Sequence, residues 1–270
     1  MLSRRSFLVT SAKAGVLTAT FAAAGCGSGS NNDNGETINT PFNGRLEDVA
    51  FTDPFAGAVF IPRSSSFNIS WPFADPPRQF SVFLRRFLEP IGGERFETPN
   101  QRIEIRQVDA RTWNIRRRDN FDLDPGAVYF LELTSSGGQL VRSVFITSGN
   151  RAITENPGTG GSLNNLNIRP TPGAFGIPRN VGRDGFELQW DPDFPPPSQF
   201  TVQLRRFKER RGSDNGGDAE QQINSQRIGD FVYLIRRNSN FQLDGLAAYY
   251  LEVDAPGQGA FRGAFTTAEF

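Results

Sequence analysis

Residues 123–129 read LDPGAVY, and residues 243–249, which lie 120 positions later, read LDGLAAY. The same offset relates QF at 79–80 to 199–200, LRRF at 84–87 to 204–207 and IRR at 115–117 to 235–237. Chance does not keep one register over such a span, and self-similarity at a fixed period indicates a repeat architecture. The body of the chain is therefore predicted to contain two copies of one unit.

Apolar residues occupy alternate positions within each copy, as in Phe80, Val82 and Leu84, which indicates half-buried strands. Strands of the first copy are predicted near 57–62, 66–71, 79–87, 102–109, 112–118, 127–135 and 140–147. Seven short strands in a unit of roughly 95 residues are typical of a Greek-key β-sandwich. The predicted fold class is all-β, with two tandem seven-stranded sandwiches that follow an N-terminal signal peptide and a flexible tether.

Two motifs resemble the fibronectin type III family. FNISW at 67–71 looks like the second strand of that family, whose tryptophan lies between the two sheets. LDPGAVY at 123–129 is similar to its Leu-x-Pro-Gly-x-x-Tyr corner, in which a tyrosine hydroxyl bonds the backbone; the second copy lacks the Pro-Gly pair. The resemblance implies fibronectin type III-like sandwiches, with another Greek-key sandwich as the alternative. The structural residues that it implies are Trp71, Trp190, Leu123, Tyr129, Leu243 and Tyr249.

The first 25 residues are typical of an export signal. They contain Arg4, Arg5 and Lys13 but no acidic residue, and their apolar stretch is too short to cross a membrane. SRRSFL at 3–8 resembles the twin-arginine signal, matched by Arg4, Arg5, Phe7 and Leu8. An ordinary basic region is the alternative interpretation.

Cys26 is the only cysteine, and AAGC at 23–26 is similar to the bacterial lipobox, although leucine is missing from its first position. The resemblance implies acylation of Cys26, and GSGSNN at 27–32 suits a flexible tether. A free thiol after ordinary cleavage is the alternative. The expected location is the bacterial cell envelope, lipid-anchored, facing the periplasm or at the cell surface. The predicted divisions are a signal peptide at 1–25, a tether at 26–54, domain 1 at 55–150, a linker at 151–173 and domain 2 at 174–270.

Composition argues against several functional classes. The chain contains no histidine, so neither a Ser-His-Asp triad nor a zinc helix motif can be assembled. Beyond residue 25 there are 26 basic and 29 acidic residues, which disfavours a nucleic-acid partner. The close pairs Asp122/Asp124 and Asp191/Asp193 are best interpreted as turn residues rather than as catalytic or calcium-binding groups. We expect no enzymatic activity, no cofactor and no metal.

Pleating directs a second set of side chains away from the predicted cores. If Phe80, Val82 and Leu84 point inward, alternate residues of the same strand point outward. Exposed aromatic residues beside arginine are typical of interface anchors. The outward set predicts a binding face, with packing of one copy on the other, or stacking of arginine on phenylalanine, as the alternative. Its members are Phe83, Arg85, Phe87, Phe130, Arg205, Phe207 and Tyr250.

The predicted fold and the predicted export and lipidation signals together favour a non-catalytic binding, adhesion or spacer role. The expected partners are membrane lipid, through acylated Cys26, and an envelope protein or glycan. The alternative is an accessory subunit of an envelope enzyme or of an export or assembly machinery.

Overall fold

The computed structural model describes residues 35–90, 94–118, 122–149, 163, 165–209, 217–238 and 242–269. The predicted signal residues Arg4, Arg5, Phe7 and Leu8 and the predicted lipidation site Cys26 lie outside these ranges. Among the described residues, no helix is long and apolar enough to cross a membrane.

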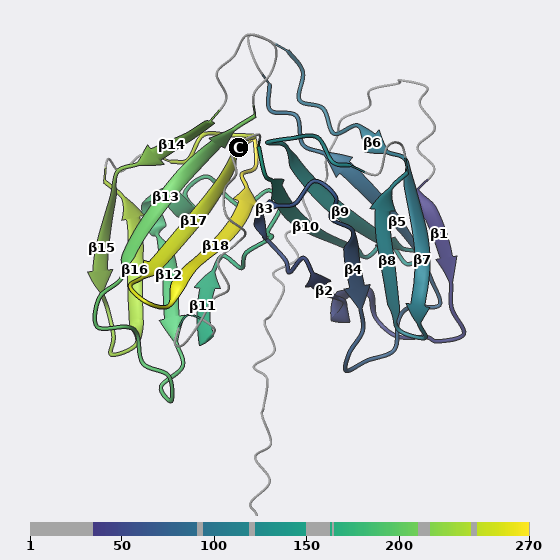
Figure 1. Cartoon of the computed structure of the whole chain (residues 1–270), viewed down its shortest axis with the longest axis horizontal. Helices are drawn as coiled ribbons and strands as arrows, with labels where there is room; N and C mark the ends of the chain where they lie inside the picture. Colours follow the sequence, from purple (N-terminus) through teal and green to yellow (C-terminus); the bar gives the residue numbers. More distant parts are fainter. Residues whose placement is uncertain are drawn as a thin grey trace, which may run out of the picture. The chain divides into compact units, whose positions relative to one another are not determined.

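The first copy is a sandwich of two sheets (Figure 1). One sheet has the order β1 (Glu36–Asn39), β5 (Gln79–Arg86), β9 (Val128–Ser135), β10 (Leu140–Thr147) and β3 (Val59–Ile61), and β6 (Asn100–Gln101) also pairs with β5. The other has the order β2 (Ala50–Asp53), β4 (Phe67–Ser70), β8 (Thr112–Arg117) and β7 (Ile103–Asp109). The pairings are antiparallel, except that β3 runs parallel to β10.

The second copy repeats this arrangement. One sheet has the order β14 (Gly217–Gln221), β13 (Thr201–Lys208), β17 (Ala248–Ala255) and β18 (Gly259–Thr266). The other has the order β11 (Leu166–Arg169), β12 (Phe186–Trp190), β16 (Val232–Arg237) and β15 (Ile223–Arg227). The short helices are η1 (Leu46–Asp48) in the first copy and α1 (Val181–Asp184) in the second.

The sheet orders refine the predicted topology. β7 pairs with β8 at the edge of the sheet β2-β4-β8-β7, and β15 pairs with β16 at the edge of the sheet β11-β12-β16-β15. This order matches the four-stranded ABED sheet of immunoglobulin constant-type sandwiches. The chain is thus a tandem of β-sandwiches of the broad immunoglobulin and fibronectin type III class, and the prediction of an all-β fold is confirmed.

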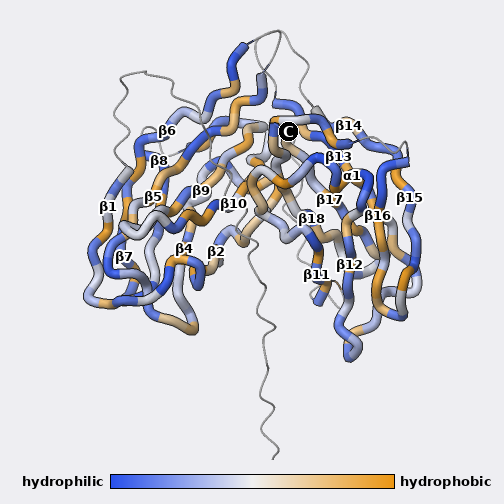
Figure 2. The backbone as a smooth tube through the Cα atoms, turned by 180° about the vertical axis from the view of Figure 1, so that it is seen from behind, coloured by the Kyte–Doolittle hydropathy of each residue, from blue (hydrophilic) through white to orange (hydrophobic). Residues whose placement is uncertain are grey.

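Each copy has its own apolar core. Trp71 packs against Phe80 and Trp113 in the first, and Trp190 packs against Phe200 and Tyr233 in the second. Leu123, Tyr129, Leu243 and Tyr249 are also fully buried in these cores. Figure 2 shows apolar and polar residues alternating along the strands that enclose them.

The first copy begins earlier than the sequence predicts. The predicted tether at 26–54 contains β1, η1 and β2, and Leu46 of η1 is completely buried in the first core. The predicted linker at 151–173 likewise contains β11. Burial of Leu46 and pairing of β1 with β5 make residues 36–53 part of the sandwich rather than part of a flexible segment.

Candidate functional site

The predicted binding face is largely covered by the sister copy. Phe87, Phe130, Phe207 and Tyr250 are buried in one cluster that both copies build. We call this cluster the interdomain core; its buried members are Val59, Phe60, Phe87, Val128, Phe130, Val144, Ile146, Phe207, Ala248, Tyr250 and Ala264. These four residues therefore do not form an exposed surface for an external partner. For them the predicted binding face is wrong, and the alternative, packing of one copy on the other, is what the structure has.

The central strands of the two copies are apolar on both faces. In β9, Tyr129 and Leu131 point into the first core, whereas Val128 and Phe130 enter the interdomain core. In β17, Tyr249 and Leu251 belong to the second core, whereas Ala248 and Tyr250 enter the interdomain core. Strands buried on both faces are expected where a sheet is covered on each side.

Aromatic contacts across the interdomain core are reciprocal. Phe130 of the first copy packs against Phe175 of the second at a ring-centroid distance of 4.5 Å. Tyr250, the counterpart of Phe130, packs against Phe60 of the first copy at 5.5 Å. Arginines also stack in both directions, because Arg142 lies over Phe175 at 4.7 Å and its counterpart Arg262 lies over Phe60 at 5.8 Å.

Ion pairs at the edge of this core are also reciprocal between the two copies. Arg86 Nε donates to Glu209 Oε1 at 2.9 Å, and Arg206 donates to Glu89. The two arginines are 120 residues apart, as are the two glutamates. Each arginine also binds the aspartate of its own corner, Arg86 to Asp124 at 2.9 Å and Arg206 to Asp244 at 2.7 Å. The same surface of each copy thus contacts its equivalent, as in the isologous interface of a symmetric dimer.

Two glycines bring the backbones of the two copies within hydrogen-bonding distance. Between the copies, Val144 N donates to Gly173 O at 2.9 Å and Ala264 N donates to Gly57 O at 2.7 Å, while Gly173 N donates to Ala264 O of its own copy at 2.7 Å. Gly57 and Gly173 have positive φ values of 79° and 88°. A Cβ at Gly57 would collide with the backbone nitrogen of Gly173, so a side chain is excluded there for two separate reasons.

The other three residues of the predicted face lie outside this core. Arg85 stacks on Phe83 at 4.8 Å and its Nη2 lies 3.3 Å from Glu132 Oε1. Arg205 Nε donates to Gln203 Oε1 at 3.0 Å. A binding role for these three residues stays a prediction.

The aspartates form structural contacts. The Tyr129 hydroxyl donates to Asp124 Oδ2 at 2.7 Å and accepts the Asp124 backbone N–H at 3.1 Å. Burial raises the pKa of Asp124, but the hydrogen bonds from Tyr129 and Arg117 and the charges of Arg86 and Arg117 outweigh it and leave that pKa below its usual value. Asp191 Oδ1 accepts the Asp193 N–H at 2.9 Å, which is a turn contact.

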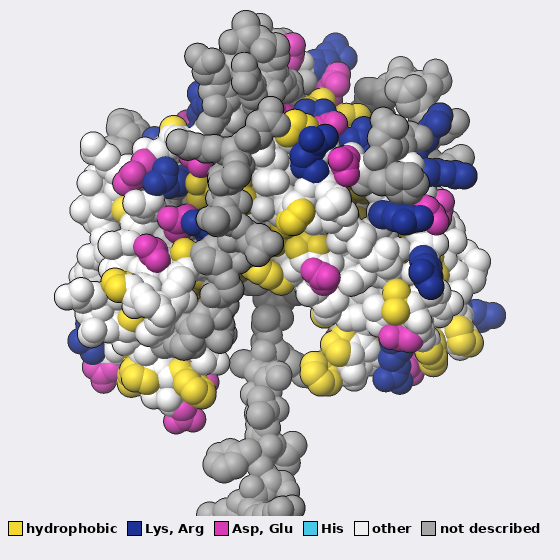
Figure 3. All heavy atoms as spheres, viewed as in Figure 1, with side chains coloured by type: hydrophobic (Ala, Val, Ile, Leu, Met, Phe, Trp, Pro, Cys, Tyr) yellow, Lys and Arg dark blue, Asp and Glu magenta, His cyan; other side chains and the backbone are white. Residues whose placement is uncertain are grey.

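Burial also raises the pKa of both corner tyrosines, Tyr129 and Tyr249, to about 12. Among the described residues, no group of His, Cys, Asp and Glu side chains could hold a metal ion. On the face shown in Figure 3, basic and acidic side chains are interspersed rather than gathered by sign.

A groove lies on the second copy, at the start of β13. Its volume is about 470 Å³. It is lined by the apolar residues Phe200, Val202 and Ile223, by Tyr233, and by the uncharged polar residues Ser198, Gln199 and Ser225. The lining contains no carboxylate, arginine, lysine or cysteine, so this groove suits binding rather than acid–base or nucleophilic chemistry.

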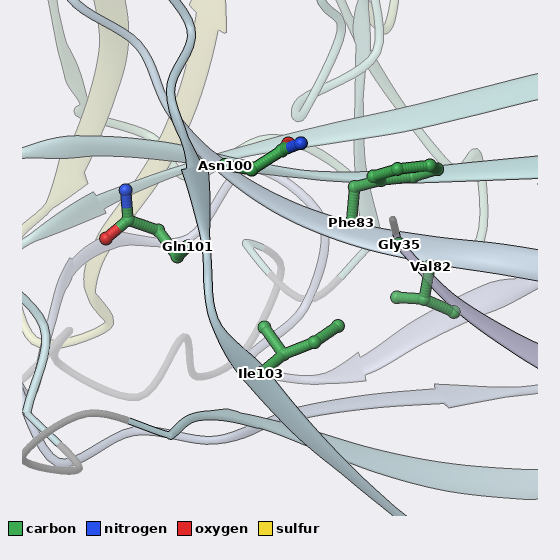
Figure 4. Close-up of a pocket in the computed structure, with 6 residues that line it drawn as sticks. All are labelled: Gly35, Val82, Phe83, Asn100, Gln101 and Ile103. Atoms are coloured by element: carbon green, nitrogen blue, oxygen red, sulfur yellow. The ribbon is translucent and has the colours of Figure 1, made fainter. Parts of the chain in front are cut away.

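The corresponding place in the first copy is closed by β1. Glu36–Asn39 pairs antiparallel with β5, with Ile38 opposite Phe80 and Glu36 opposite Val82. What remains is a cavity of about 20 Å³ between Gly35, Phe83 and Asn100, shown in Figure 4, which has room for about one water molecule. The counterparts of the groove residues, Phe80, Val82, Ile103 and Trp113, are buried, whereas Phe200, Val202, Ile223 and Tyr233 are half-buried.

The N-terminal parts of the two copies are 116 residues apart, as in IPR at 61–63 and 177–179, whereas the later strands are 120 apart. At the offset of 116, ETIN at 36–39 corresponds to AITE at 152–155, which lies outside the described residues. The tryptophans differ between the copies. Trp71 Nε1 donates to Arg45 O at 2.9 Å, whereas buried Trp190 Nε1 has no hydrogen-bond partner among the described residues.

Solved structures match this chain only distantly. No family model and no curated protein matches the chain. Among solved structures, the tandem Ig repeats of Dlar are 15% identical, with 86% of this chain and 96% of that chain covered and a TM-score of 0.21. A chain in the complex of Dpr2 Ig1-Ig2 with DIP-Theta Ig1–Ig3 is 11% identical, with 82% and 99% covered and a TM-score of 0.22. TM-scores this low carry no argument about function.

Proposed function

We propose that this chain is an exported, lipid-anchored protein of the cell envelope that binds a protein partner and catalyses no reaction. The observation that carries the binding role is the groove on the second copy, which is lined by apolar and uncharged polar side chains and lies beside an edge of β13 that no described strand covers at 201–203. Convergent acid and base groups, which catalysis would require, do not line it.

The N-terminal sequence supports export and anchoring. Arg4 and Arg5 precede Phe7 and Leu8 with the twin-arginine spacing, and Cys26 follows three small residues. Acyl chains on Cys26 would hold the sandwiches at a membrane surface. The reciprocal contacts of the interdomain core would hold the two copies together as one binding unit on that anchor.

Growth with a labelled fatty acid, followed by membrane fractionation, tests the anchor. The wild-type chain should carry label and sediment with membranes, and Cys26→Ser should lose both properties. Arg4→Lys with Arg5→Lys should block export without changing the cysteine. Fatty-acid label on the Cys26→Ser variant would contradict the proposal.

A further inference from the structure

Exposed apolar side chains are concentrated at one end of each copy. Among the described residues six large hydrophobic side chains are exposed, and four of them lie in turns near the core tryptophans. Phe73 and Val108 of the first copy are 93% and 60% exposed, and Phe194 and Ile228 of the second are each 50% exposed. We call these two pairs the loop tips. Single exposed apolar residues are common, but several gathered at one place mark a contact surface.

A hydrogen bond between two turns builds the loop tip of the first copy. Phe73 lies in the loop between β4 and β5, and Val108 lies near the end of β7. Trp71 N donates to Arg111 O at 3.0 Å, which holds this loop beside the β7–β8 turn. The two apolar side chains are therefore carried by neighbouring turns at the same end of the sandwich.

The second copy has the same construction. Trp190 N donates to Phe231 O at 2.9 Å, which joins the β12–β13 loop to the β15–β16 turn. Val108 and Ile228 are 120 residues apart, which is the offset of the repeat, and each of the two loops contains one phenylalanine. Both copies thus present an aromatic and an aliphatic side chain at equivalent places.

The two loop tips lie at the same end of the molecule. β5 and β13 each begin next to a loop tip and end at the edge of the interdomain core, where Arg86 pairs with Glu209 and Arg206 pairs with Glu89. The two strands therefore converge away from the tips. Figure 1 shows the loops that follow β4 and β12 at the lower end of both copies, and in Figure 3 hydrophobic side chains appear at that end.

A lipid surface fits two separate tips better than a protein does. A stable protein interface buries about 800 Å² on each partner, whereas each tip offers two apolar side chains on adjoining turns. A bilayer requires no shape complementarity, and it accepts apolar side chains that stand beside polar ones at the level of its headgroups. The geometry of the tips therefore favours a membrane as their partner.

The charges beside the tips favour a contact that depends on apolar side chains rather than on anionic lipid. Arg111 Nη2 lies 2.7 Å from Asp75 Oδ1, and Arg227 Nη2 lies 3.3 Å from Asp230 Oδ1. Since each of these arginines is paired with a carboxylate, the two turns do not form a basic patch for anionic headgroups. A carboxylate is costly in hydrocarbon, so Asp193 limits insertion of its loop to the headgroup level.

The length of chain before the first sandwich fits this placement. Nine residue steps separate Cys26 from Gly35, the first residue that the structure describes, and they span at most about 30 Å. Gly35 lies beside the Phe83 ring, four positions along β5 from Gln79 at the tip end, which is about 14 Å. A lipid on Cys26 therefore keeps the loop tips within reach of the bilayer.

We propose that the loop tips rest on the membrane that carries the anchor, with their four apolar side chains among the headgroups of a phospholipid surface. The interdomain ion pairs, at the opposite end of β5 and β13, then face away from the bilayer. This inference rests on the proposed membrane anchoring. The experiment tests the contact separately from acylation.

The full chain is coupled through the Cys26 thiol to a maleimide phospholipid, in phosphatidylcholine vesicles that contain a lipid with a diazirine near the headgroup end of its acyl chain. Photolysis and mass spectrometry then locate the residues in contact with lipid. Residues 72–78, 106–111, 191–198 and 227–231 should be labelled about tenfold more than residues 122–126 and 242–246, which lie at the opposite end. Salt should not reduce this labelling, because the contact is apolar.

Two variants complete the test. Phe73→Ser combined with Phe194→Ser should lower labelling of the tips about tenfold, since it removes apolar area that lipid covers. Phe55→Ser is the matched control and should leave labelling unchanged, because Phe55 is 39% exposed but packs on Phe261 outside the tips. Near-ultraviolet circular dichroism checks both folds.

Three outcomes would overturn the inference: unlabelled tips in the wild-type chain, equal labelling of both ends, or unchanged labelling in the double variant. If the double variant does not fold, the comparison of the two ends in the wild-type chain still decides. The maleimide attaches the chain whether or not cells acylate Cys26, so fatty-acid labelling in cells tests the anchor separately.

Discussion

The two copies share their cores but differ at one sheet edge. Phe80 and Val82 are 1% and 0% exposed beneath β1, whereas Phe200 and Val202, at the same positions of the repeat, are half-buried beside an open groove. The corner tyrosines and the interdomain ion pairs are alike in both copies. The eight described strands of the second copy, β11–β18, enclose its core, whereas the first copy adds β1, whose Ile38 packs against its core at the edge of β5.

The largest expected effect concerns the core tryptophans. Trp71→Ala should lower the free energy of unfolding by about 3–5 kcal/mol, because it leaves a cavity among Phe80 and Trp113. Trp71→Phe should cost about 1 kcal/mol more than Trp190→Phe, since only Trp71 Nε1 loses a hydrogen bond to Arg45 O. Urea denaturation of the full chain measures both. Equal costs for the two phenylalanine variants would show that the copies do not differ here.

High pH should act on both copies alike. Burial raises the pKa of Tyr129 and of Tyr249 from 10.0 to about 12 in the folded chain. A raised folded pKa stabilises the chain fully below the unfolded value near 10, and this stability is lost as pH rises from 10 to 12, by about 1.4 kcal/mol per pH unit for each tyrosine. Absorbance at 295 nm should show these two tyrosines ionising together with unfolding. Their ionisation near pH 10 in a folded chain would contradict the buried corners.

Charge reversal tests the reciprocal ion pairs. Glu209→Arg places a cation beside Arg86 and should cost about 2–3 kcal/mol, and Glu89→Arg should do the same beside Arg206. Combining Glu209→Arg with Arg86→Glu should recover part of the loss. Thermal unfolding of the four chains is the measurement. No recovery in the double variant would mean that the loss arises elsewhere than in this pair.

The smallest expected effect opens the first copy. Ile38→Asp should remove β1 from β5 and cost about 1–2 kcal/mol, the value of burying part of an aliphatic side chain. Ile153→Asp is the matched control and should change stability by less than about 0.5 kcal/mol. Chemical denaturation compares the two. An equal loss from both substitutions would indicate that the second copy is closed by its own chain.

Repetition explains how much could be predicted from the sequence. The all-β fold and the two cores could be predicted because Trp71, Tyr129 and Phe145 return at nearly one offset, and core positions repeat with the fold. The outward phase of Phe130 also follows from pleating, but pleating does not say what covers a face, and the sister copy does.

The start of the first copy and the groove could not be predicted in the same way. β1 has a single apolar residue, Ile38, and its partner Phe80 lies 42 positions away, so no local pattern marks it as a strand. The groove lies where, among the described residues, no strand covers β13 at 201–203, whereas β1 covers the equivalent part of β5. Hydrophobic periodicity indicates which segments form strands. It does not indicate which strand edges are left without a neighbour.

Hydrogen exchange at four amides tests the central claim, that one edge is closed and the other open, most directly. The account predicts that the Phe80 and Val82 amides, which face β1, exchange at least about 100-fold more slowly than the Phe200 and Val202 amides in the unliganded full chain. The Leu131 and Leu251 amides in the central strands should be protected alike in both copies. Equal protection at Val82 and Val202 would contradict the account, because it would show that a strand covers both edges.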